Sequence, residues 1–258
     1  MPLVLYEERG TIAVLTLNRP EVHHALNREI LLELREAFNR LERKGSIRAA
    51  VITGSGSDSF SAGADLKERA AMTEEEVARF IPFIRDTFTL IERLPQPVIA
   101  AINGRALGGG MELALACDVR ILSERAVMGL KETTLGIIPG AGGTQRLPRL
   151  IGIPKAKELI LTGRTITASE ALAIGLVNQV VPPEEVLSTA LKWAEEISAN
   201  GPIAVKQAKW AINHGMKTDL DTGLELETSA YRLLIPTNDR REGLHAFREK
   251  RKPNFTGE

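Results

Sequence analysis

The chain has 258 residues, 43% of them hydrophobic and 26% charged, which suits one large domain with a substantial core or one domain plus an appendage. Its 33 basic and 33 acidic side chains cancel, and this balance disfavours nucleic-acid binding as the main activity, because such proteins usually carry a basic excess. The single cysteine excludes an intrachain disulfide, and without a secretory pattern or an apolar run of about 18 residues we expect a cytoplasmic protein that does not span a membrane.

The first half of the chain alternates short apolar or β-branched segments with segments of helical period. A Gly/Ser-rich loop is expected at 54–65. The expected strands are 3–8, 11–17, 49–54 and 97–104, and the expected helices are 27–44, a short one from near Asp65, 77–94, and one that begins at Gly108–Gly110 and runs through Cys117.

The second half repeats this alternation and then becomes helical. Strands are expected at 118–124, 126–130 and 177–181, a Gly/Pro loop at 136–143, and helices at 144–150, 156–164, 169–176, 184–199, 202–215 and 218–235. Strands that alternate with helices predict an α/β fold with crossover connections, here followed by a helical C-terminal part.

Three consecutive glycines, Gly108–Gly110, stand between a predicted strand and a predicted helix. Glycine has no Cβ, and the first N–H groups of a helix have no partner within it, so a ligand can approach these amides closely. Such a site stabilises an anion, either a phosphate or an oxyanion. Tight packing of the strand against the helix is the alternative interpretation.

Two carboxylates follow, Glu112 in the first turn of the predicted helix and Glu132 in an apolar stretch after Lys131. Two carboxylates can divide acid and base work on one water molecule, because burial raises a carboxyl pKa and can keep one group protonated. Together with exposed amides they suggest chemistry on a carbonyl compound through an enolate-like state. They are 20 residues apart and can meet only through tertiary folding. The alternative interpretation is that Glu112 only interacts favourably with the dipole of its helix and that Glu132 lies on a surface loop.

Other chemistries lack their motifs. The second glycine loop, PGAGGT at 139–144, has neither the Lys-Ser/Thr of a phosphate-binding loop nor the third glycine of a dinucleotide fingerprint. The four histidines are dispersed without metal-ligand spacing, and no Gly-x-Ser-x-Gly elbow occurs. We therefore expect no nucleotide, metal or serine-triad chemistry.

The predicted helix 27–44 carries basic side chains that could form an RNA-binding face. Acidic side chains alternate with them along the same helix. This mixture is better interpreted as a solvated face with ion pairs between residues i and i+4.

A resemblance to a known family runs nearly from end to end of the chain. It is carried by the segments LNRPEVHHALN, FSAGADLKE, AINGRALGGGMELALACD, MGLKETTLGIIPGAGGTQRLPR, GLVNQVV and AFREKRKPNF. With these segments the chain resembles the crotonase superfamily, and within it the enoyl-CoA hydratases. The resemblance implies a crotonase-like α/β spiral of repeated ββα units. It also implies a helical C-terminal region that forms a homotrimer, and hexamers built as two stacked trimers. We therefore expect residues 1–200 to form the catalytic and CoA-binding core and 201–258 the oligomerisation region.

The resemblance also implies an activity, the addition of water across the C2–C3 double bond of a 2-enoyl-CoA thioester. By position, the backbone N–H groups of Ala64 and Gly109 bind the thioester oxygen. Glu112 activates the water and Glu132 protonates C2. The acyl-CoA thioester is the substrate, and no metal or redox cofactor is needed.

The CoA contacts implied by the resemblance come from two parts of the chain. Backbone groups near one end of the site match Ala25, Ala62, Asp65 and Leu66, with Lys67 nearby. Phe247 and Lys250 match tail residues that reach the CoA of a neighbouring subunit.

Three positions depart from the family pattern. His24 stands at the CoA entrance where Asn is common, and Leu130 and Lys131 replace the Gln and Pro of several straight-chain hydratases. Three segments are especially similar to 3-methylglutaconyl-CoA hydratases of leucine breakdown: GADLKERA, MGLKET and the C-terminal stretch KWAINHGMKTDLDTGLELE. The acyl chain of the substrate can therefore be a short straight chain or a branched, carboxylated one. The rival activities are an isomerase that moves the double bond from C3 to C2, which typically keeps one of the two carboxylates, and an RNA-binding protein.

Overall fold

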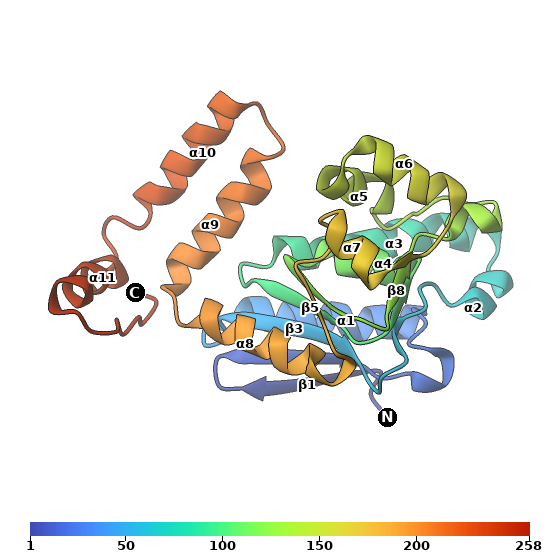
Figure 1. Cartoon of the computed structure of the whole chain (residues 1–258), viewed down its shortest axis with the longest axis horizontal. Coiled ribbons are helices and arrows are strands. Elements are labelled where there is room, and N and C mark those ends of the chain that lie inside the picture. The colour runs from blue at the N-terminus through green and yellow to red at the C-terminus, as the bar shows by residue number, and fades with distance from the viewer.

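The computed structural model describes residues 1–258 and contains two sheets and a projecting group of C-terminal helices (Figure 1). The larger sheet has six strands in the order β1-β2-β3-β5-β7-β10, and the smaller has four in the order β4-β6-β8-β9. The strands are β1 Val4–Arg9, β2 Ile12–Leu17, β3 Ala49–Gly54, β4 Ser59–Ser61, β5 Val98–Ile102, β6 Arg105–Leu107, β7 Val119–Ser123, β8 Val127–Gly129, β9 Ile166–Thr167 and β10 Gln179–Val181.

Eleven α-helices and three short 3₁₀ helices connect and cover the sheets. The α-helices are α1 Arg28–Arg43, α2 Leu66–Ala71, α3 Glu74–Arg93, α4 Gly109–Ala116, α5 Gly143–Ile151, α6 Ile153–Thr162, α7 Ala168–Ala173, α8 Val186–Ser198, α9 Pro202–Gly215, α10 Leu220–Arg232 and α11 Asn238–Glu249. The 3₁₀ helices are η1 Pro20–Val22, η2 Glu132–Leu135 and η3 Pro183–Glu185.

The chain adds one strand to each sheet and then a helix, and this unit repeats. β3, β5 and β7 lie parallel in the large sheet, and each is followed by β4, β6 or β8, which lie parallel in the small one. Only β1 and β9 pair antiparallel, with β2 and β8. Parallel pairing requires a crossover, and the helices supply it. The predicted α/β fold of ββα units is therefore confirmed.

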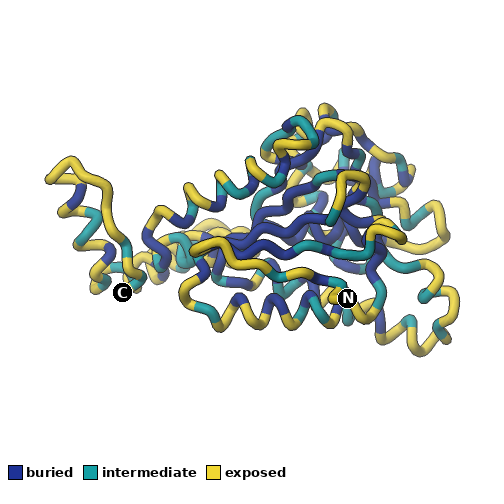
Figure 2. Tube along the Cα trace, turned by 90° about the horizontal axis from the view of Figure 1, so that it is seen from below, coloured by how far each residue is buried: buried dark blue, intermediate teal, exposed yellow.

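The core lies on both faces of the large sheet, whose central strands are buried throughout (Figure 2). On one face, Val51 and Ile99 pack against the α8 side chains Val186 and Ala190. On the other, α1 buries a stripe that includes Leu34 and joins the larger apolar cluster. Parallel strands covered on both faces are continuously apolar, as AAVITG and PVIAAI are.

Several elements were not expected from the sequence. β4 lies in the segment 54–65 that was predicted as loop, and the short strands β6 and β9 were also missed. Each has only two or three residues, too few for a period of two to be visible. α11 was missed because its helical period is masked by charge, and Phe247 on it is exposed.

α9, α10 and α11 extend away from the sheets (Figure 1). α9 is fastened to the body through Lys209, whose ammonium donates to the Gln96 carbonyl at 3.0 Å and to Asp118 Oδ2 at 2.7 Å. Asp118 also accepts the Val98 N–H, at 2.7 Å. A largely buried ion pair that also satisfies backbone groups fixes where α9 leaves the body. No helix in the structure combines the length and apolar character needed to cross a membrane.

Candidate active site

The glycine triplet at the start of α4 lies directly against the segment that follows β4. A Cβ on Gly110 would lie 2.2 Å from the Ser61 carbonyl oxygen, and one on Gly63 would lie 2.6 Å from the Leu107 carbonyl oxygen. Only glycine allows this approach of two backbones. Tight packing is therefore real at Gly110, and it brings the start of α4 beside Ala64.

At this junction the backbone N–H groups of Ala64 and Gly109 have no acceptor within the protein. Gly109 is the first residue of α4, where a helix leaves its N–H groups unpaired. A Cβ on Gly109 would lie 3.5 Å from the Ala64 nitrogen, so the two amides are neighbours. Paired free amides of this kind can both donate to one oxygen that acquires negative charge.

Glu112 lies in the first turn of α4, and only 3% of its surface is exposed. Its Oε1 accepts the N–H groups of Ala141 at 2.8 Å and Gly143 at 2.7 Å. The second glycine loop therefore holds a carboxylate and not a phosphate. Sequence reasoning missed this role of Ala141 and Gly143, although closely spaced glycines before a helix were a visible signal of exposed amides.

Glu132 is the first residue of η2 and is half-buried. A Cβ on Gly108 would lie 3.0 Å from Glu132 Oε1, which places this carboxylate beside the glycine triplet. Its Oε2 is buried and has no hydrogen-bond partner. The fold thus brings Glu112 and Glu132 to the same glycine-rich junction from separate elements.

Burial sets the electrostatics of the two carboxyls. The pKa of Glu112 is raised from 4.5 to about 7: burial is the main cause and the negative charge of Glu132 adds to it, while the two backbone amides and the positive charge of Arg146 lower it. Burial also raises the pKa of Glu132. A carboxyl whose pKa is about 7, as for Glu112, can exchange protons with a substrate near neutral pH.

The first group of expected CoA contacts gathers where two loops run together. Ala62 donates its N–H to the His23 carbonyl at 2.9 Å, and Asp65 donates to the Leu26 carbonyl at 3.1 Å. Asp65 also caps α2 and pairs with Arg19, which donates to the Ala25 carbonyl at 2.6 Å.

The next two residues, Leu66 and Lys67, begin α2 and are exposed. Residues from both loops therefore flank Ala64 on one side of the glycine junction.

His24 does not line an entrance, as the sequence suggested, because it is almost completely buried. Its Nδ1 accepts the Arg19 N–H at 3.0 Å and its Nε2 bonds the Ser55 carbonyl at 2.9 Å. The ring therefore joins the loop before α1 to the loop after β3.

Phe247 and Lys250 are not brought to this site. Both lie at the C-terminal end of α11 and are exposed. α11 and α2 lie at opposite ends of the molecule in Figure 1. These two residues therefore cannot contact a CoA bound at Ala64 of the same chain.

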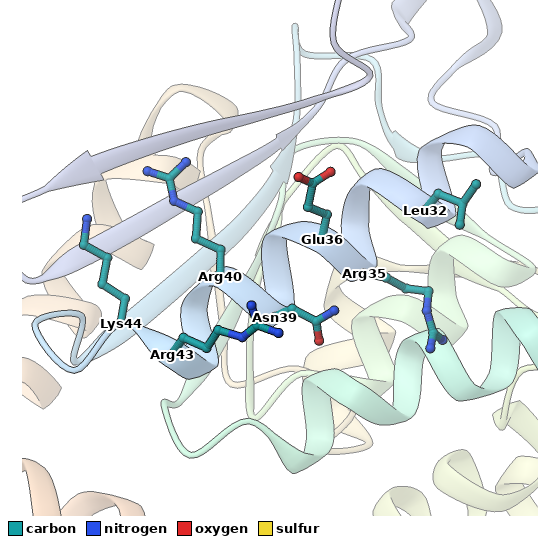
Figure 3. A pocket seen from close by; sticks show the side chains of 7 residues that line it. All are labelled: Leu32, Arg35, Glu36, Asn39, Arg40, Arg43 and Lys44. Atoms are coloured by element: carbon teal, nitrogen blue, oxygen red, sulfur yellow. The ribbon is translucent and has the colours of Figure 1, made fainter.

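A hollow on the surface of α1 is lined by basic and polar side chains (Figure 3). Arg40 and Lys44 both pair with Glu8 of β1, and Arg35 lies over the Phe83 ring, 5.3 Å from its centre. The expected i, i+4 pairs within α1 are therefore wrong, since the partners come from other elements. Most of this positive charge is already neutralised or stacked, which gives little support to RNA binding here.

Comparison with known proteins agrees with this geometry. The model of the enoyl-CoA hydratase/isomerase family matches residues 7–258. The chain belongs to this family, also called the crotonase family. It is therefore an enzyme of the hydro-lyase type.

Three relatives illustrate the similarity. The crystal structure of enoyl-CoA hydratase from Bacillus anthracis superposes with a TM-score of 0.98 at 52% identity, over 99% of this chain and 100% of that one. The short-chain-enoyl-CoA hydratase of Clostridium acetobutylicum is 47% identical over 249 residues, 96% of this chain and 95% of its own length. The human mitochondrial methylglutaconyl-CoA hydratase is 47% identical over 258 residues, 98% of this chain and 76% of its own length.

Proposed function

We propose that the enzyme adds water across the C2–C3 double bond of 2-enoyl-CoA thioesters to give 3-hydroxyacyl-CoA, as in the breakdown of fatty acids or branched-chain amino acids. The observation that carries this proposal is the pair of carboxyls beside two free amides. Glu112 has one oxygen held by loop amides, and Glu132 has a buried oxygen without a partner. One water can bridge two such groups.

The steps follow from what each group can donate or accept. Ionised Glu112 takes a proton from the water while its oxygen bonds C3 of the substrate. The electron pair of the double bond moves to the thioester oxygen, where the Ala64 and Gly109 N–H groups stabilise the enolate. Protonated Glu132 then gives its proton to C2. Each fixed amide contributes about 3 kcal/mol by the standard of measured oxyanion holes.

A double-bond isomerase is the nearest rival, because it uses the same amides to stabilise the same enolate. Isomerisation requires a proton to leave one carbon and return to another, which one carboxylate can do. The second buried carboxyl favours hydration, since adding water requires a base for the water and an acid for the carbon.

The first prediction is hydration of crotonyl-CoA, measured as loss of the ultraviolet absorbance of its conjugated thioester. We expect Glu132→Gln to lower kcat by about 100-fold or more while thioester binding persists, because the amide keeps the shape but cannot supply the proton.

We also expect kcat to fall as the pH drops through about 7, where Glu112 becomes protonated. Near-wild-type turnover of Glu132→Gln would contradict the mechanism, and activity only with a 3-enoyl-CoA would favour the isomerase.

A carboxylated, branched acyl chain is the second candidate substrate, and Arg69 favours it. This residue lies on α2 one turn after Asp65, and its Nε is buried without a partner. Its guanidinium lies over the Phe80 ring, 5.0 Å from the centre. The negative charge of Glu68, the preceding residue, is the acidic charge that acts on it, without a salt-bridge contact. An unpaired, partly buried guanidinium suits a substrate carboxylate. This supports 3-methylglutaconyl-CoA, the substrate class in the name of the human relative.

The second prediction concerns Arg69→Met, which keeps an unbranched apolar stem and removes the charge. If Arg69 binds the acyl carboxylate, kcat/KM for 3-methylglutaconyl-CoA should fall by about 10- to 100-fold and that for crotonyl-CoA should change little. Arg79→Met, on the exposed part of α3, is the control. Equal losses on both substrates would refute selectivity by Arg69.

We also propose that residues 1–200 form the catalytic core and 201–258 the contact region of a homotrimer or a hexamer of two trimers. α9 and α10 enclose a groove of about 650 Å³ with a mainly apolar lining. Ile212, Met216 and Leu220 are each more than half exposed along these helices. An exposed apolar surface of this kind marks a protein contact, and a second copy of the chain is the proposed occupant.

The third prediction is that Ile212→Asp reduces the particle mass measured by light scattering, because a charge in a dry contact is costly. Leu172→Asp, an exposed apolar residue of α7 outside the groove, is the matched control and should leave the mass unchanged. If Phe247 and Lys250 complete a neighbour's CoA site, Ile212→Asp should also raise KM for the thioester more than it lowers kcat. A monomeric wild-type protein would refute the assembly.

A further inference from the structure

The position of the base depends on a loop outside its own helix. The two N–H groups that bind Glu112 Oε1 come from Ala141, in the loop before α5, and from Gly143, the first residue of α5. A displacement of this loop would move the carboxylate or leave it buried without partners. Whatever fixes the loop therefore fixes the base.

Arg146 of α5 holds this loop from the other side. Its Nη1 donates to the Ala141 carbonyl at 2.9 Å, so Ala141 is bound through its N–H by Glu112 and through its C=O by Arg146. Gly142 has φ +112°, and a Cβ there would lie 2.1 Å from Arg146 Nη1. The guanidinium occupies the space that a side chain at Gly142 would need.

α3 fixes the guanidinium in turn. Arg146 Nε donates to Glu92 Oε2 at 3.1 Å, and Nη2 donates to Thr89 Oγ1 at 3.3 Å. The other oxygen of Glu92 accepts from Lys217, just beyond α9, at 2.8 Å. Only 16% of the Arg146 side chain is exposed, so these bonds are shielded from solvent.

We propose that Arg146 is a positioning residue for hydration. It holds Ala141 in place, and through Ala141 it orients the carboxylate of Glu112 toward the attacking water. Glu92 in turn fixes the orientation of the Arg146 guanidinium. The inference rests on the proposed role of Glu112 as the base. Lysine could not replace the arginine fully, since one ammonium cannot reproduce the planar fork that meets Glu92 and Ala141 together.

The charge of Arg146 has a separate effect from its hydrogen bonds. The charged groups that face Glu112 are Glu132, whose charge raises the Glu112 pKa, and Arg146, whose charge lowers it. Loss of the Arg146 charge therefore raises the pKa of Glu112 further. The base would then be ionised only at higher pH, and the acid limb of the kcat profile would move upward.

The fourth prediction compares Arg146→Gln with Arg146→Lys. We expect Arg146→Gln to lower kcat for crotonyl-CoA by roughly 10- to 100-fold and to move the acid limb to higher pH. KM should change little, because the Ala64 and Gly109 amides lie on other elements. Arg146→Lys should keep the acid limb near that of wild type and still lower kcat, because it keeps the charge and loses the fork.

Arg149→Gln is the matched control, since Arg149 lies on the same helix, is exposed and donates only to Gln145. Hydrogen exchange of the Ala141 and Gly143 amides gives a readout that needs no turnover. Both Arg146 variants should exchange these amides faster, and Arg149→Gln should not. A folded Arg146→Gln with unchanged exchange and an unchanged acid limb would overturn the inference. A wild-type protein without hydratase activity would instead count against the proposed function, and amide exchange would still decide whether Arg146 fixes the loop.

Discussion

The structure is organised around one buried carboxylate, that of Glu112. Placing an ionisable group in a dry interior is costly unless hydrogen bonds compensate it, and here the amides of Ala141 and Gly143, at the start of α5, do so. The compensation is partial, because burial still raises the Glu112 pKa to about 7. The buried Glu112 therefore lowers folding stability progressively as the pH rises from about 4.5 to about 7, and the loss is complete above that pH. This loss of stability accompanies a functional benefit, because a carboxyl with such a pKa can act as a base near neutral pH.

A second constraint, the close approach of backbones, explains the glycines. Gly110 meets the Ser61 carbonyl, and Gly63 meets the Leu107 carbonyl, at distances that no Cβ allows. These contacts seat the start of α4 against the segment that carries Ala64. The free amides of Ala64 and Gly109 are thus fixed before substrate arrives, which is what makes such donors effective toward a developing oxyanion.

Much of this arrangement was visible in the sequence, for identifiable reasons. Alternating periods predicted the α/β fold, and glycines before an apolar helix predicted the unpaired amide of Gly109 and the position of Glu112 in the first turn. The meeting of Glu112 and Glu132 was not derivable from spacing, because it depends on the pairing of β6 with β8. The resemblance to the crotonase family suggested both residues, and the fold shows how they come together.

Other features had no local signal at all. The contacts of Arg146 with Glu92 and Ala141 join three elements, and nothing in GGTQRLPR indicates which carbonyl the arginine would reach. The ion pairs of α1 were assigned to the wrong partners because Glu8 lies on β1, which is far from Arg40 and Lys44 in the sequence but next to them in the fold. Local periodicity reports which face is buried, whereas polar networks depend on which elements become neighbours.

The role of Glu112 as the buried base is best tested by titrating its own carboxyl, by carbon-13 NMR of the side-chain carboxyls in the unliganded enzyme. The signal is assigned by its absence from Glu112→Gln. We expect a pKa of about 7, well above the ordinary 4.5. A Glu112 carboxyl that titrates at its ordinary value would contradict this role, because a fully solvated carboxylate is neither buried nor poised as the base.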